Sequence, residues 1–195
     1  MSAQSRGMGS AVAGICLLLS ACVGGPLTTP PTPTPATIPA ATTSAAPLPS
    51  AAVQTVAVAS GAGFASPTGH IVCLMGSDGV RCEFHGTKSW KAPRPDGCEL
   101  DWDSALALGD QVEGVCAGDT IMGFAATGQG TTAWWKAGGP TVTVADANMT
   151  LAVLPYDSAL VVGRIRCDSA STGVTCHNLS TAHGFSMAAE GYGVF

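Results

Sequence analysis

Two stretches of equal length decide the fold of this chain. The first is Cys73-Leu-Met-Gly-Ser-Asp-Gly-Val-Arg-Cys82, and the second is Cys167-Asp-Ser-Ala-Ser-Thr-Gly-Val-Thr-Cys176. Each pair of cysteines encloses eight residues, and both stretches end in Gly-Val-x-Cys. Each stretch predicts a β-hairpin whose loop, 76–79 or 170–173, ends on a glycine able to take a positive φ angle. The chain therefore contains the same hairpin twice.

The hairpin geometry predicts which residues face each other. With Cys73 opposite Cys82, one face of the first hairpin is apolar, whereas Arg81 and Glu83 point to the other face. The other facing pairs on the apolar side are Met75 with Val80 and Ile71 with Phe84. The Cα atoms of a non-hydrogen-bonded pair lie about 4.5 Å apart, a distance that a disulfide accepts. Each hairpin can therefore close its own bridge.

Six cysteines remain when Cys16, in the predicted signal peptide, and Cys22, the predicted lipidation site, are set aside. They are Cys73, Cys82, Cys98, Cys116, Cys167 and Cys176. An even number of cysteines in an exported domain indicates disulfides, although six cysteines allow many connectivities. Because each hairpin closes one bridge, Cys98 is left to pair with Cys116. A zinc site is the less favoured alternative, since paired Cys-x-x-Cys spacings are absent.

Short apolar or alternating runs predict further strands. These runs are Val142 with Val144, residues 151–154 and residues 161–165. Residues 101–108 predict a capped helical turn instead, which Gly109 stops within two turns. The expected fold class is mainly β, a small disulfide-stapled antiparallel sandwich or open barrel preceded by a signal peptide and a disordered linker.

Residues 1–21 predict a lipoprotein signal peptide. One positive charge, Arg6, precedes an apolar run over residues 8–19 that is too short to span a bilayer. The run closes in Leu19-Ser-Ala-Cys22, which resembles the lipobox of bacterial lipoproteins. In a lipobox the cysteine sulfur takes a diacylglycerol with acyl chains such as palmitate. Cys22 is therefore the predicted lipidation site, and an ordinary cysteine in a cleaved secretory signal is the alternative.

Residues 22–56 predict a lipidated N-terminus and a disordered linker. Eight of the thirteen prolines lie between Pro26 and Pro49, and the segment contains no charged residue. Its Pro and Thr favour extended polyproline II geometry, with a rise of about 3.1 Å per residue. The composition is also typical of O-glycosylated stalks, although a plain spacer is favoured. The six-cysteine β domain of residues 57–195 is thus expected at the outer face of the cytoplasmic membrane, lipid-anchored in the cell envelope.

Charge and motifs exclude several function classes. A net charge of −5 disfavours nucleic acid as a partner. The sequence contains no hydrolase motif and no phosphate-binding loop, so no catalytic residue, metal ligand or cofactor is predicted. His183 is the most interesting histidine, and a structural histidine bonded to a turn is favoured over a general base. His70 opposite His85, with Glu83 diagonal, is a second arrangement for which simple solvation is favoured over a metal site.

Trp134-Trp135-Lys136 is the densest aromatic feature and the predicted partner-binding site. In a strand, adjacent residues point to opposite faces, so one indole is expected in the core and the other on the surface. An exposed indole can stack on a sugar ring or anchor a protein partner. A tryptophan that folds back over the core as a lid is favoured over this binding role.

Six different short motifs follow one another along the domain. They are Phe64-Ala-Ser-Pro-Thr-Gly-His-Ile-Val-Cys73, Gly79-Val-Arg-Cys82, Val115-Cys-Ala-Gly-Asp-Thr120, Leu154-Pro-Tyr156, Gly173-Val-Thr-Cys-His-Asn178 and His183-Gly-Phe185. With the six-cysteine frame, they resemble an uncharacterised family of exported actinobacterial, mycobacterial-type cell-envelope lipoproteins. The resemblance spans nearly the whole domain and implies a cell-envelope lipoprotein, without a known activity, cofactor or catalytic residue. The chain departs from the family pattern at His70, where Asn is usual, at Asp157 and Ala182, where Gly is usual, and after Met187, where no Arg follows.

The sequence therefore predicts a membrane-anchored binding or interaction module of the cell envelope, with an envelope protein or a glycan as its partner. Contact with the membrane is expected through the lipid at Cys22. One alternative is an envelope-acting enzyme with catalytic residues dispersed along the chain, and another is a secreted-type inhibitor of a hydrolase. The enzyme is disfavoured because no catalytic pair is visible in the sequence.

Overall fold

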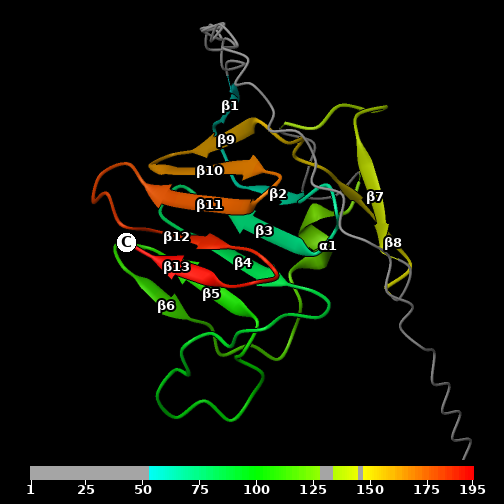
Figure 1. Ribbon diagram of the computed structural model, residues 1–195. Coiled ribbons are helices and arrows are strands. Elements are labelled where there is room, and N and C mark those ends of the chain that lie inside the picture. The colour runs from blue at the N-terminus through cyan, green and yellow to red at the C-terminus, as the bar shows by residue number, and fades with distance from the viewer. Residues whose placement is uncertain (1–52, 128–133, 145–146) are drawn as a thin grey trace, which may run out of the picture. The chain divides into compact units, whose positions relative to one another are not determined.

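The computed structural model describes residues 53–127, 134–144 and 147–195 (Figure 1). The predicted signal peptide, Cys22 and the linker as far as residue 52 lie outside the described residues. The first strand, β1 (Gln54–Val58), begins ahead of the domain start expected at residue 57. In the described part of the chain, no helix is long and apolar enough to cross a membrane.

Two sheets contain eleven of the thirteen strands of the described residues (Figure 1). The five-stranded sheet is antiparallel throughout, in the order β2 (Ala62–Ala65), β3 (Ile71–Met75), β4 (Val80–Phe84), β5 (Ala105–Leu108) and β6 (Val112–Gly114). The six-stranded sheet has the order β1, β9 (Ser158–Val162), β10 (Ile165–Ala170), β11 (Gly173–Asn178), β12 (Gly184–Met187) and β13 (Tyr192–Val194). In this sheet β1 runs parallel to β9, and the other pairs are antiparallel.

The main hydrophobic core lies between these two sheets. Phe64 from β2 and Phe185 from β12 are completely buried and belong to the same cluster. Along β10 and β11 buried residues alternate with half-buried ones, as expected for strands with one face on a core. The arrangement is an open sandwich, which confirms the predicted mainly β class; in the described part of the chain the sheets do not close into a barrel.

Both predicted hairpins form with the expected register. Cys73 faces Cys82 between β3 and β4, and Cys167 faces Cys176 between β10 and β11. The three disulfides join Cys73 to Cys82, Cys98 to Cys116 and Cys167 to Cys176, as predicted. The two loops differ in two respects. Gly173 has a φ of 127° whereas Gly79 does not take a positive φ. The loop between β3 and β4 spans the expected residues 76–79, whereas Ala170 and Gly173 pair as the last residue of β10 and the first of β11, which shortens the second loop to Ser171 and Thr172.

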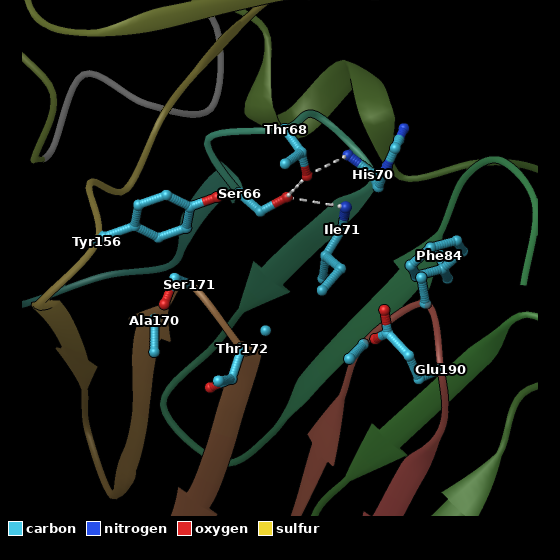
Figure 2. A pocket seen from close by; sticks show the side chains of 13 residues that line it. Ser66, Thr68, His70, Ile71, Phe84, Tyr156, Ala170, Ser171, Thr172 and Glu190 are labelled. Atoms are coloured by element: carbon cyan, nitrogen blue, oxygen red, sulfur yellow. Dashed lines mark hydrogen bonds between the residues drawn. The ribbon is translucent and has the colours of Figure 1, made fainter. Parts of the chain in front are cut away.

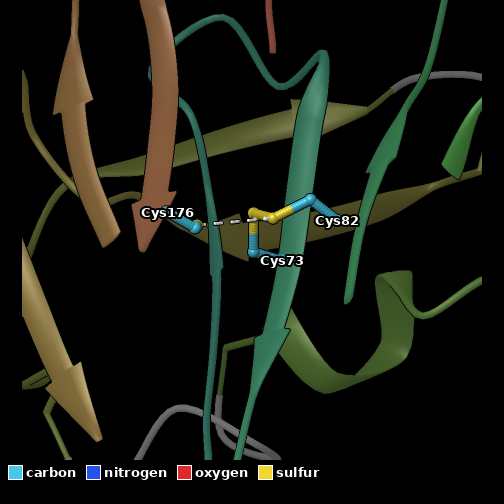
Figure 3. A group of neighbouring side chains, drawn as sticks. All are labelled: Cys73, Cys82 and Cys176. Atoms are coloured by element: carbon cyan, nitrogen blue, oxygen red, sulfur yellow. Dashed lines mark hydrogen bonds between the residues drawn. A yellow bond between two sulfur atoms is a disulfide. The ribbon is translucent and has the colours of Figure 1, made fainter. Parts of the chain in front are cut away.

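The hairpin disulfides meet in the core, and Figure 3 shows the Cys73–Cys82 bridge beside Cys176 of the other hairpin. Cys82 Sγ lies 3.9 Å from Cys176 Sγ, so the two bridges contact each other across the sandwich. Both sulfurs are in disulfides and carry no hydrogen, which makes this a van der Waals contact. Cys73, Cys82 and Cys176 also form the one group of three potential metal ligands found among the described residues. Because none of these sulfurs is a free thiolate, the group is not a metal site.

The repeated hairpin is part of a larger repeated unit. Strands β2 to β6 form a five-stranded meander in one sheet, and β9 to β13 form another in the second sheet. The equivalent cysteines Cys82 and Cys176 are 94 residues apart. The sandwich is thus two copies of one meander, packed with their disulfides face to face, and β1 adds an extra edge strand to the second copy.

Two local predictions are wrong. Residues 101–108 do not form a helical turn, because residues 105–108 are strand β5, in which Leu106 and Leu108 are buried and pair with β4. The run 161–165 is not one strand either. Gly163, with a φ of 56°, and Arg164 form the turn that separates β9 from β10.

A smaller cluster covers the far side of the five-stranded sheet. The short helix α1 (Met122–Ala125) contacts β2 and β3, and the pair β7 (Thr141–Val144) and β8 (Met149–Ala152) lies beside it (Figure 1). The buried members of this cluster are Ala65, Val72, Ile121, Met122, Ala125 and Leu151. The side of the first hairpin opposite the core is therefore largely covered by protein.

Candidate functional site

The segment that carries Trp134 and Trp135 is a turn and not a strand. Trp134 Nε1 donates a hydrogen bond to the carbonyl oxygen of Gly63, 2.9 Å away, and its indole packs against the main core. Trp135 Nε1 donates to the carbonyl oxygen of Pro140 at 3.0 Å. Both indoles are half-buried, so the expected division into one core and one surface tryptophan does not occur. The reason is that a turn does not alternate its side chains between two faces.

A groove of 490 Å³ lies beside the two indoles. Its apolar lining consists of Val56, Trp134, Trp135, Pro140, Val153, Leu154 and Pro155. Lys136 is the single charged side chain among the lining residues. We call this hollow the tryptophan groove. Its surface favours an apolar occupant and offers few groups to hydrogen-bond a polar one.

Strand β1 forms one border of the tryptophan groove, through Gln54 and Val56. The amide of Gln54 donates to the carbonyl oxygen of Asp157, so this residue turns its backbone groups toward β9. Because alternate residues of a parallel strand bond to opposite sides, the N–H and C=O groups of Thr55 and Ala57 point away from β9. Within the described chain β1 pairs with β9 alone, which leaves this outer edge open.

The open edge lacks the features that usually protect an edge strand. Four of the five residues of β1 are exposed, and the strand contains neither a charged residue nor a proline. Val56 is 40% exposed on the groove side. Natural sheets commonly block such edges with lysine, proline or a bulge, because free backbone groups invite pairing with another chain. The tryptophan groove and the β1 edge together present apolar surface and unpaired backbone groups side by side.

A separate, polar site surrounds Glu83, which the sequence places on the outward face of the first hairpin. The side chain is almost completely buried, because the segment that contains Thr120 and Ile121 folds over it. Its Oε2 accepts hydrogen bonds from the Thr120 hydroxyl (2.8 Å) and the Ile121 amide (3.0 Å). Its Oε1 pairs with the Arg81 guanidinium. His85 Nε2 lies 3.4 Å from Oε2, within ion-pair distance.

The surroundings of Glu83 keep it charged. Burial raises the pKa of the carboxyl, but the nearby His85, the amide of Ile121, the Thr120 hydroxyl and the Arg81 charge together lower the pKa below its ordinary value of 4.5. A carboxyl with a lowered pKa is a poor general acid and a weak base at neutral pH. The arrangement therefore serves the structure, tying the 119–121 segment to β4.

The histidines singled out in the sequence lie apart. His183 Nδ1 lies 2.6 Å from the carbonyl oxygen of Asp110, so this ring is bonded to a turn. The ring of His70 lies 5.8 Å from Phe84, whereas His85 turns to Glu83. His70, His85 and Glu83 therefore do not converge as a metal site would require. Among the described residues, no histidine ring is hydrogen-bonded to a serine or threonine hydroxyl.

Comparisons of the chain with family models, with curated proteins and with solved structures found no match. The candidate site consequently stands on its geometry. Sequence analysis identified Trp134 and Trp135 but missed Val56, Pro140 and Pro155, the residues that complete the tryptophan groove. These three residues lie in separate segments, and no local pattern in the sequence indicates that they meet.

Proposed function

We propose that this protein is a lipid-anchored interaction module of the cell envelope, which belongs to the actinobacterial lipoprotein family that it resembles. In this proposal Cys22 carries the lipid, the linker spans the distance from the membrane, and the β domain binds a partner. The partner is an extended segment of an envelope protein, which lies in the tryptophan groove and pairs with β1.

The observation that carries this proposal is the continuity of the tryptophan groove with the open edge of β1. An extended polypeptide can add a strand to an exposed sheet edge, with main-chain hydrogen bonds giving affinity and side-chain pockets giving specificity. Thr55 and Ala57 supply the unpaired backbone groups, and the groove supplies the apolar pocket for alternate side chains. Both features lie along the same strand.

A polypeptide suits this groove better than a glycan. The indole N–H groups of Trp134 and Trp135 are already used in hydrogen bonds to Gly63 and Pro140. Sugar hydroxyls buried against the remaining carbon surface would lose hydrogen bonds to water without replacement. The backbone groups that a peptide brings instead find matching groups on β1.

The test selects extended peptides from a phage-displayed random library on the immobilised domain. The selected peptide is then titrated against three proteins: wild type, Thr55→Pro and Thr55→Val. Proline removes the outward N–H of residue 55 without removing a bond to β9, whereas valine keeps it. We expect peptide binding to be lost with Thr55→Pro and retained with Thr55→Val, at unchanged melting temperature.

Hydrogen exchange provides the second measurement. The amides of Thr55 and Ala57 should exchange rapidly in the free domain and become protected when the peptide binds. Trp135→Ala should weaken peptide binding about tenfold or more, since interface tryptophans contribute strongly. The proposal is wrong if no peptide is enriched, if Thr55→Pro binds as well as wild type, or if a glycan occupies the groove in place of peptide.

A further inference from the structure

A second hollow lies at one end of the sandwich and shares no lining residue with the tryptophan groove (Figure 2). It has a volume of 420 Å³ and is formed where the β10–β11 turn and the β12–β13 turn approach the loop between β2 and β3. Ile71 and the buried ring of Phe84 provide apolar surface inside it. We call this hollow the end pocket. Its size is within the range of small-molecule sites in proteins.

The end pocket is lined by hydroxyl groups. Figure 2 shows Ser66, Thr68, Tyr156, Ser171 and Thr172 among the side chains that line it. Ser66 Oγ accepts a hydrogen bond from the amide of Ile71 at 3.0 Å and lies 3.2 Å from Thr68 Oγ1. These bonds hold the 66–71 loop in shape, so this wall of the pocket is fixed before any ligand arrives.

Other polar groups of the end pocket have no side-chain hydrogen-bond partner among the described residues. In the described part of the chain, no side-chain hydrogen bond involves the Tyr156 hydroxyl, the Ser171 or Thr172 hydroxyl, or the Glu190 carboxylate. The exposed ring of Tyr156 lies at the edge of the same hollow, at 40% exposure. The pocket thus combines an aromatic face, an apolar floor and several free hydrogen-bonding groups.

The charge of the end pocket restricts its ligand. No lysine or arginine lines it, and His70 is the one lining side chain that could carry a positive charge, so a phosphate, sulfate or carboxylate would find little countercharge there. Glu190 offers a carboxylate, which accepts two hydrogen bonds from neighbouring hydroxyl groups. A molecule with many hydroxyl groups and an apolar face meets all of these requirements.

We propose that the end pocket binds a neutral sugar ring. The carbon face of the ring stacks on Tyr156, and its hydroxyls bond to Glu190, Ser171 and Thr172. This site is separate from the tryptophan groove and does not depend on it. A domain with both sites would hold a protein partner at β1 and a glycan at the other location.

The test is a chemical-shift titration of the ¹⁵N-labelled domain with two sets of probes. The neutral set is methyl glucoside, methyl galactoside, methyl mannoside, maltose and cellobiose, and the anionic set is glucose 6-phosphate and glucuronate. We expect at least one neutral sugar to bind with millimolar affinity and to shift the amides of Ser171, Gly173 and Ala189. The anionic sugars should bind more weakly.

Paired variants locate the site. Tyr156→Ala should weaken sugar binding about tenfold, because it removes the stacking surface. Phe124→Ala removes an aromatic ring of comparable exposure on α1 and should have no effect on binding. Glu190→Gln should weaken binding while keeping the fold, and Glu113→Gln on β6 is its control.

Three outcomes overturn the proposal. The first is that no neutral sugar of the set produces a saturable shift. The second is that shifts appear only at the tryptophan groove or are equal in wild type and Tyr156→Ala. The third is that glucosamine, titrated in addition as a cationic probe, binds in a salt-dependent way while the neutral sugars do not, which would assign the pocket to a cation.

Discussion

The contribution of the charged Glu83 side chain to the free energy of unfolding can be measured as a function of pH. Its pKa is lowered in the folded protein, so the carboxylate stabilises the fold above its ordinary pKa of 4.5. This contribution is lost as the pH falls through the pKa of the folded state. We expect Glu83→Gln to lower the free energy of unfolding by about 2 kcal/mol at neutral pH, because Thr120, Ile121 and Arg81 lose a charged acceptor.

Urea unfolding of Glu83→Gln and wild type at a series of pH values checks this expectation. The difference between them should shrink as the pH is lowered from about 7 to about 3, since protonation removes the same charge from wild type. Glu113→Gln is the control, because Glu113 is exposed in β6 and should show a small difference at every pH. If the difference in free energy of unfolding between wild type and Glu83→Gln stayed constant over this pH range, the role assigned to the charge would be contradicted.

At the scale of elements, α1 approaches β2 so closely that only glycine fits at position 63. A Cβ atom on Gly63 would lie 2.0 Å from the carbonyl oxygen of Phe124 in the helix. Gly63→Ala should therefore push α1 away from the sheet and lower the free energy of unfolding by about 2 kcal/mol or more. Gly123→Ala, within α1 itself, meets no atom within 4 Å and should be neutral or slightly stabilising. Equal stability of the two variants in urea would refute this packing argument.

The three disulfides should contribute to the free energy of unfolding in a different order from the one that their loop lengths predict. The Cys98–Cys116 bridge encloses the longest loop, with a sequence separation of 18 against 9 for each hairpin bridge. In the chain-entropy model this loop gains most, about 3 kcal/mol. The hairpin bridges also fill the centre of the core, where Cys82 and Cys176 are in contact. Their removal therefore adds the cost of a cavity.

Double alanine variants separate the two contributions to disulfide stability. We expect Cys167→Ala/Cys176→Ala to lose about 1 to 2 kcal/mol more than Cys98→Ala/Cys116→Ala in urea unfolding. Non-reducing peptide mapping of each variant verifies that the remaining bridges keep their partners. If the Cys98–Cys116 variant were the less stable one, loop entropy and not packing would dominate.

At the scale of the whole molecule, the proposed anchor places the β domain at the membrane through one residue. Burial of an acyl chain is worth about 0.8 kcal/mol per CH₂ group, so a diacylglycerol on Cys22 holds the protein durably. We expect Cys22→Ala, expressed as the full chain in a bacterium that processes lipoproteins, to be released from membranes or left unprocessed. Cys16→Ala, in the predicted signal peptide, is the matched control and should remain in the detergent phase. Detergent-dependent anchoring of a normally processed Cys22→Ala protein would refute lipidation at this residue.

The local sequence was sufficient for those elements whose partners are close along the chain. The register of each hairpin follows from the alternation of side chains and from two cysteines that must face each other, and the structure has this register in both copies. Trp134 and Trp135 were also recognisable as a site candidate, since aromatic residues are few in this chain. Strand β5, residues 105–108, could not be predicted in this way. A run with Leu106 and Leu108 fits a strand or a helical turn equally well, and only the pairing with β4 makes it a strand.

Only the tertiary structure determined the surfaces that are formed by segments far apart in the sequence. The tryptophan groove needs Val56, Trp134 and Pro155 side by side, and the burial of Glu83 needs the 119–121 segment to fold over β4. No periodicity in the sequence predicts these contacts between distant segments. They result from the packing of the two meanders, and the free energy of that packing depends on buried area and shape, summed over the whole domain. Short-range patterns therefore determined the two hairpins and the bridges of this protein, whereas long-range packing determined its grooves and pockets.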